Sequence, residues 1–166
     1  MTTNATARLT LEERLTRLED AQAIQRVMST YGESVDNGYD LAALERLLTQ
    51  DLVWTSNAFG EYHGRKEYLE GQAQIGKGVA WAFHVMVPLR IDVLDEVRAR
   101  GTFYLLMLGT FIRGDTAARE PMVISARYDN EFAKQDDVWR CSRMNVHFNQ
   151  VSRLTEGWVR EQYWAG

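Results

Sequence analysis

The sequence has few of the residues that cross-link a chain or interrupt its helices and strands, with one cysteine and two prolines in 166 residues. The single cysteine, Cys141, excludes a disulfide within the chain and fits a reducing compartment. We expect it to act as a small apolar residue of a strand. A chain of this length buries a full core without disulfide support.

Long apolar runs and strong charge are also missing. No stretch reaches the roughly 18 apolar residues of a membrane span, and the polar residues 1–8 lack the apolar core of a signal peptide. The net charge is −4, and Lys and Arg are scattered rather than gathered in a basic stripe. We therefore expect no membrane or nucleic-acid partner, and a cytoplasmic location.

Metal-binding spacings are absent as well. The three histidines, His63, His84 and His147, are far apart in the sequence, and no CxxC or HExxH pattern occurs. We expect neither a metal site nor a cofactor.

Aromatic residues and methionine, by contrast, are plentiful: five Trp, seven Tyr, six Phe and six Met. Two interpretations remain open. They fill a dense core, or they line an apolar pocket for a small hydrophobic molecule.

Helical periodicity dominates the first third of the chain. Apolar residues recur at helical spacing from Leu9 to Val35, and Thr10 with Glu13 is typical of a capping box. A second helix is predicted over Leu41–Leu48, and a third begins at Gly64.

Strand patterns follow. A short strand, Leu52–Ser56, precedes four long ones at 81–93, 97–112, 122–135 and 138–152, whose short connections suit an antiparallel meander. Helices first and strands after them predict an α+β fold, a cone-shaped curved antiparallel sheet wrapped over about three N-terminal helices (an α+β barrel). We expect residues 1–8 to be disordered, 9–152 to form one domain, and 153–166 to be a short helix or an interface segment.

An ionisable side chain, His84, lies inside the apolar run 81–93. Such an imidazole is either a satisfied core residue or a base. Asp36 ends the first predicted helix, where it either forms an Asx turn or meets a positive partner, since the helix dipole disfavours an anion there. A carboxylate that reaches an imidazole fixes its tautomer and raises its basicity. The two residues are therefore a candidate proton-abstracting pair.

Six segments follow a known pattern: Glu19–Asp36, Asp40–Leu44, Leu52–Thr55, Gly64–Glu67, Tyr128–Phe132 and Asp137–Ser142. Together they resemble the SnoaL-like branch of the nuclear transport factor superfamily, over roughly residues 12–150. The resemblance implies the cone fold. It does not choose among the dehydratases, cyclases, isomerases, hydrolases and non-catalytic subunits that share that fold.

A narrower resemblance is to scytalone dehydratase, bile-acid 7α-dehydratase and hexachlorocyclohexane dehydrochlorinase. These enzymes use an Asp at the end of the first helix and a His on the first long strand, where this chain has Asp36 and His84. Tyr31 matches a tyrosine of the bile-acid enzyme. The resemblance thus implies a catalytic set of His84, Asp36 and Tyr31.

This chain also departs from those enzymes. Val35 replaces a tyrosine of scytalone dehydratase, and Met144 and Met107 stand where relatives carry an arginine and an acid. The segment Ser125-Ala126 lies near the position at which scytalone dehydratase carries a second histidine. The groups that handle the leaving group therefore do not carry over, and neither does the substrate.

We predict a cofactor-independent lyase that carries out a dehydratase-type elimination on a small, largely apolar, cyclic substrate. A cyclase or isomerase using the same base is an alternative, as is a non-catalytic binding subunit like the β chain of ring-hydroxylating dioxygenases. Candidate substrate-binding residues are Trp54, Met86, Met107, Met144, Asn145 and Phe148, and residues of these types in such strands more often belong to the core. Of these, Asn145 shares the strand face of Arg143 and His147, so it enters the pocket only if a bulge reverses the strand.

Apolar residues also occupy the other face of strand 97–112, at Tyr104, Leu106 and Leu108. A monomer rarely exposes such a patch. We expect a homo-oligomer, with a trimer, as the resemblance implies, slightly favoured over a dimer.

Overall fold

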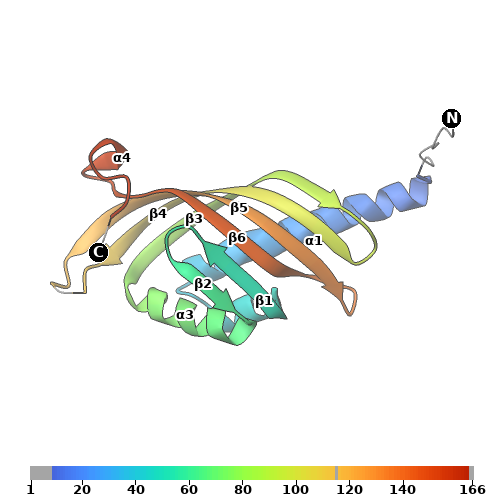
Figure 1. Ribbon diagram of the computed structural model, residues 1–166, viewed down its shortest axis with the longest axis horizontal. Helices are drawn as coiled ribbons and strands as arrows, with labels where there is room; N and C mark the ends of the chain where they lie inside the picture. The colour runs from blue at the N-terminus through green and yellow to red at the C-terminus, as the bar shows by residue number, and fades with distance from the viewer. Residues whose placement is uncertain (1–8, 115, 165–166) are drawn as a thin grey trace.

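The structure is a computed structural model that describes residues 9–114 and 116–164. The expectation for residues 1–8 therefore lies outside the described residues. A curved sheet arches over the helices α1 and α3 (Figure 1). The elements in chain order are α1 Leu11–Asp36, α2 Leu41–Arg46, β1 Leu48–Ser56, β2 Gly60–His63, α3 Arg65–Lys77, β3 Val79–Val93, β4 Arg98–Ile112, β5 Arg119–Gln135, β6 Val138–Arg153 and α4 Gly157–Arg160.

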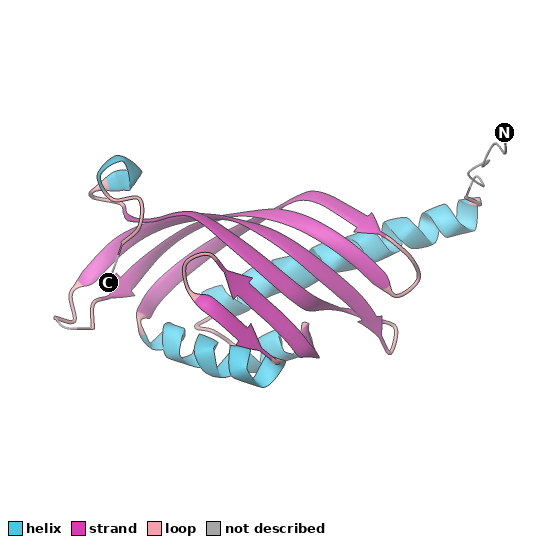
Figure 2. Cartoon of the chain, viewed as in Figure 1, coloured by secondary structure: helices cyan, strands magenta, loops and turns pink. Residues whose placement is uncertain are grey.

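The six strands form one sheet in the order β2-β1-β6-β5-β4-β3 (Figure 2). The four long strands pair antiparallel, which confirms the predicted meander and the α+β class. One pairing differs from a purely antiparallel sheet, because β1 lies parallel to β6. Helix α3 carries the chain from the β1–β2 edge to the far edge, and the meander then returns it beside β1.

Local chemistry determines the start of the first helix but not the end of the second. The Thr10 hydroxyl accepts a hydrogen bond from the Glu13 N–H at 3.1 Å, and the Glu13 carboxylate accepts one from the Thr10 N–H at 2.7 Å, so the predicted capping box is present. The predicted end of the second helix is wrong. Leu48 is fully buried and pairs with Cys141 in the sheet, so tertiary burial overrides the helical pattern from that residue onward.

The core lies between the inner face of the sheet and α1. Asp20 of α1 accepts a hydrogen bond from the Trp139 indole at 2.7 Å, and the Lys134 ammonium lies 2.7 Å from the same carboxylate. These contacts fix α1 against β5 and β6, and α1 also packs along β3. The last residue of α1 is thereby brought to the inner face of β3. No helix in the described part of the chain is long and apolar enough to cross a membrane.

Candidate active site

Asp36, at the end of α1, and His84, on β3, are in direct contact, as the sequence predicts. Asp36 Oδ1 lies 2.6 Å from His84 Nδ1, and the two carboxylate oxygens accept the His84 backbone N–H at 3.0 and 2.9 Å. The side chains are 22% and 7% exposed, respectively. The carboxylate therefore holds both the ring and the backbone of the histidine.

Gly32 allows this contact. A Cβ at this position would lie 3.3 Å from Met86 Cγ and 3.4 Å from His84 Cβ, tighter than an ordinary contact. A larger residue would push the last turn of α1 away from β3. Gly32 therefore permits the close approach of α1 to β3 beside the Asp36–His84 contact.

The contact also orients the imidazole ring. Because Nδ1 faces Asp36, Nε2 is the ring nitrogen left for a ligand. A neutral imidazole that donates through Nδ1 carries its lone pair on Nε2. The pair is thus arranged as a base with a fixed tautomer.

A cavity of about 160 Å³ adjoins His84. Its walls come from α1, α3, the sheet and the β1–β2 turn, and most of them are apolar. The lining residues are Tyr31, Val35, Tyr39, Trp54, Phe59, Gln72, Ile75, His84, Leu105, Met107, Phe111, Ile124, Tyr128 and Phe148. None of these is a Lys, Arg, Asp or Glu, and their polar side-chain groups are tyrosine hydroxyls, the Gln72 amide, the Trp54 indole and the His84 imidazole.

Three tyrosines form a buried cluster at the cavity. The Tyr31 and Tyr68 hydroxyls lie 2.9 Å apart, and the rings of Tyr31 and Tyr128 meet edge to face at 6.3 Å. Burial raises the pKa of Tyr31, Tyr68 and Tyr128 well above the usual 10. These phenols stay protonated at physiological pH, so they can donate hydrogen bonds but are poor proton donors.

Tyr39 is a fourth tyrosine, which the sequence did not single out. It follows Gly38 in the turn after α1 and has a φ of 59°, a left-handed conformation that is uncommon for a tyrosine. Its ring packs against Gly76 of α3, where a Cβ would lie 3.1 Å from the ring atoms. Burial, and then the charge of Asp36, raise the pKa of Tyr39 to about 12. The turn thus directs a neutral phenol into the cavity wall beside the carboxylate.

The predicted substrate-binding residues divide into two groups. Trp54, Met107 and Phe148 line the cavity together with Tyr31. Met86 and Met144 do not: Met144 is buried in the core, and Met86 packs against Gly32.

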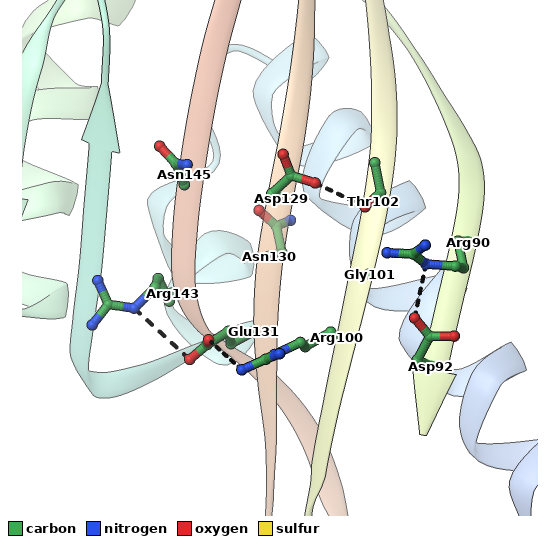
Figure 3. Close-up of a pocket in the computed structure, with 10 residues that line it drawn as sticks. All are labelled: Arg90, Asp92, Arg100, Gly101, Thr102, Asp129, Asn130, Glu131, Arg143 and Asn145. Carbon is green, nitrogen blue, oxygen red and sulfur yellow. Dashed lines mark hydrogen bonds and ion pairs between the residues drawn. The ribbon is translucent and has the colours of Figure 1, made fainter. Parts of the chain in front are cut away.

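Asn145, which was a candidate only if a bulge reversed its strand, does not line the cavity. It accepts a hydrogen bond from Thr55 at 3.2 Å, and it borders a charged hollow on the outer face of the sheet (Figure 3). The alternation of β6 is kept there, with Met144 and Val146 buried on either side of it. No bulge turns Asn145 inward, so it is not part of the cavity.

Several lining residues were missed: Phe59, Gln72, Ile75, Phe111 and Tyr128. The alternation of strand 97–112 already grouped Phe111 with Met107, and that signal was available. Gln72 and Ile75 lie on α3, whose packing under the sheet no local pattern reveals. In the described residues, no group of three or more His, Cys, Asp or Glu side chains could hold a metal ion.

Sequence comparison finds a matching family and several similar proteins. The SnoaL-like domain family matches residues 16–145. Hexachlorocyclohexane dehydrochlorinase 1 of Sphingobium indicum is 28% identical over 145 residues, which cover 84% of this chain and 88% of that protein. Gamma-hexachlorocyclohexane dehydrochlorinase, also from Sphingobium indicum, is 26% identical over 84% of this chain and 87% of its own length.

Solved structures give the same result. A type 2 hexachlorocyclohexane dehydrochlorinase superposes with a TM-score of 0.76 at 26% identity, covering 85% of this chain and 93% of its own. A type 3 enzyme from Novosphingobium barchaimii gives 0.74 at 25% identity, covering 85% and 94%. The curved sheet over N-terminal helices is therefore the fold of these dehydrochlorinases.

Proposed function

This chain belongs to the SnoaL-like domain family, and we propose that it is a lyase that eliminates a small leaving group from a cyclic, largely apolar substrate. The contact between His84 and Asp36 beside an apolar cavity is the observation that supports this most directly. The dehydrochlorinases to which the chain is similar are named for an elimination of the same class.

In the proposed step, His84 Nε2 takes a proton from the carbon next to the one that bears the leaving group. The electrons of the broken C–H bond form the new C=C bond, and the leaving group departs with its own bonding pair. Asp36 stabilises the imidazolium that forms. No electrons pass to an external acceptor, so this step requires no redox cofactor.

Tyr31 would hydrogen-bond the departing group or a substrate oxygen. Its raised pKa means that it shares its proton without losing it. When Tyr68 donates to Tyr31, the Tyr31 proton is free for the ligand. Met144, which stands where the resemblance to the dehydrochlorinase places an arginine, is buried in the core, so neutral donors replace a cation here.

Two probes, each a single six-membered ring with one leaving group, test the proposal: 3-chlorocyclohexanone, which loses HCl, and 3-hydroxycyclohexanone, which loses water. Chloride release or product mass is followed for the native chain, for His84→Ala and for the exposed control His63→Ala. A product lighter than its substrate by HCl or H₂O, formed by the native chain and by His63→Ala only, supports a lyase. A product of unchanged mass from either probe would instead indicate an isomerase or cyclase. Binding without conversion of either probe would indicate a non-catalytic subunit, and both outcomes would overturn the proposal.

A further inference from the structure

The chain beyond β6 returns to the sheet and docks on it. The Val151 N–H donates to the Gln162 carbonyl at 2.9 Å, and the Trp164 N–H donates to the Val151 carbonyl at 2.6 Å. The Tyr163 hydroxyl donates to the Phe148 carbonyl at 3.0 Å. Residues 162–164 thus form a short strand-like extension beside the end of β6.

A charged pair anchors this segment. Arg153 Nε lies 2.8 Å from Glu161 Oε2, and both side chains are partly shielded. Its hydrogen bond from Arg153 lowers the pKa of the Glu161 carboxyl, which keeps the pair ionised. The Gln162 amide also donates to the Asn149 carbonyl at 2.9 Å. The side chains of Glu161 and Gln162 therefore both attach the segment to the end of β6.

The docked segment reaches the cavity through one ring. The Trp164 indole packs edge to face on Phe111, with ring centroids 6.3 Å apart, and Phe111 lines the cavity while Trp164 does not. Trp164 therefore contacts a wall residue of the cavity without lining the cavity itself. This support lies outside residues 16–145, which match the family.

The cavity is small in its observed form. At about 160 Å³ it is close to an apolar cavity of about 150 Å³ that is known to bind benzene. That space matches one six-membered ring, and a second fused ring enters it fully only if a wall side chain moves. Because the Trp164 indole contacts the Phe111 ring, it opposes a swing of that ring toward the C-terminal segment.

We propose that Trp164 is a positioning residue that holds Phe111 against the cavity and so limits the ligand to a single six-membered ring. This inference rests on the proposed function for the identity of the pocket, since it concerns the substrate that the His84 site admits. Docking of the C-terminal segment then acts as a specificity determinant.

The test measures binding of two ketones that carry no leaving group, cyclohexanone and the fused two-ring 2-decalone, by calorimetry. Trp164→Ala is expected to raise the affinity for 2-decalone relative to cyclohexanone by about tenfold. Trp164→Phe should retain the native preference, because a second ring still supports Phe111.

Trp158→Ala is the matched control, because Trp158 lies in the same segment, is 58% exposed and makes no ring contact within the described residues. It should leave the ratio of the two affinities unchanged. An unchanged ratio in folded Trp164→Ala, or an equal change in Trp158→Ala, would overturn the proposal. Because neither ketone is turned over, this result is independent of whether the chain is a lyase.

Discussion

The hairpin of β3 and β4 carries apolar residues on both of its faces, yet the two faces have different surroundings. On the inner face His84 pairs with Met107, and one residue along, on the outer face, Phe83 pairs with Leu108. Met107 is 4% exposed, whereas Phe83 and Leu108 are 52% and 40% exposed. Helix α1 covers the inner face, and nothing in the described chain covers the outer one. The difference shows that apolar character does not by itself identify the core face; the covering helix does.

The outer face has the features of an interface. Its large exposed residues follow β3 and β4: Trp81, Phe83, Val87, Leu89, Tyr104, Leu106 and Leu108. Beside them lies a charged region, in which Glu131 sits between Arg100 at 3.6 Å and Arg143 at 3.8 Å (Figure 3). Both signs of charge on one face allow it to pack against a copy of itself. We propose that the chain forms a homo-oligomer through this face, as a trimer or a dimer.

Removal of the inner-face imidazole should have the largest effect on activity. His84→Ala is expected to lower kcat by about 10²–10⁴-fold, the usual contribution of a positioned general base. The second histidine–carboxylate pair of the chain is the control: His63 lies 3.2 Å from Glu61, but its side chain is 62% exposed. His63→Ala should change initial rates by no more than about twofold. A loss below about tenfold for a folded His84→Ala would remove His84 from the mechanism.

Neutralising the carboxylate should have the next largest effect. Asp36→Asn keeps the shape of the side chain but removes the charge that stabilises the imidazolium, so kcat should fall on the order of 10²-fold. KM should change little, because the charge acts on His84 and not on an apolar substrate. Steady-state kinetics separates the two constants. A raised KM with an unchanged kcat would mean that Asp36 binds substrate instead.

On the outer face, a charge should alter assembly and leave the site intact. Leu106→Glu places a carboxylate in the middle of the exposed apolar residues, where burial against another subunit is costly. Sedimentation velocity should show an oligomer for the native chain and a shift toward the 19.1 kDa monomer for the variant. A native chain that sediments as a stable monomer at micromolar concentration would contradict the proposed interface.

The smallest expected effect concerns the titration of Tyr39. Its pKa of about 12 means that the phenol stays neutral where an exposed tyrosine, with a pKa near 10, ionises. Since the folded state holds the proton more tightly, this stabilisation is complete below about pH 10 and is lost as the pH rises through about 12. Alkaline titration of tyrosinate absorbance, compared with Tyr39→Phe, isolates this group. Asp36→Asn should lower the pKa of Tyr39. An unchanged pKa would show that the charge of Asp36 does not act on Tyr39.

Much of the fold could be predicted because its signals are local. The capping residues Thr10 and Glu13 are three positions apart, and the alternation around Met144 and Asn145 identifies the buried face of β6. The contact between Asp36 and His84 was expected because the resemblance to known enzymes supplied a long-range relation that periodicity lacks.

The remaining features depend on contacts between distant segments. The left-handed turn at Tyr39 has no local signature, since a non-glycine residue adopts it only when its surroundings hold it there. Trp164 meets Phe111 across more than fifty positions of sequence, as their numbers show, and no spacing rule connects them. The start of β1 at Leu48 was missed for the same reason, because its partner is Cys141.

The parallel pairing of β1 with β6 has a consequence for the order in which the protein is made. The register from Val53 with Arg143 to Ser56 with Val146 joins an early segment to the last long strand. During synthesis, β1 and β2 therefore leave the ribosome long before their neighbour exists, as a hairpin too small to be stable alone. Until β6 emerges, one side of β1 presents unpaired N–H and C=O groups to solvent and to other nascent chains. The interval before β6 is complete is thus when this chain is most prone to aggregate, and slower translation of the last strand should lower its soluble yield.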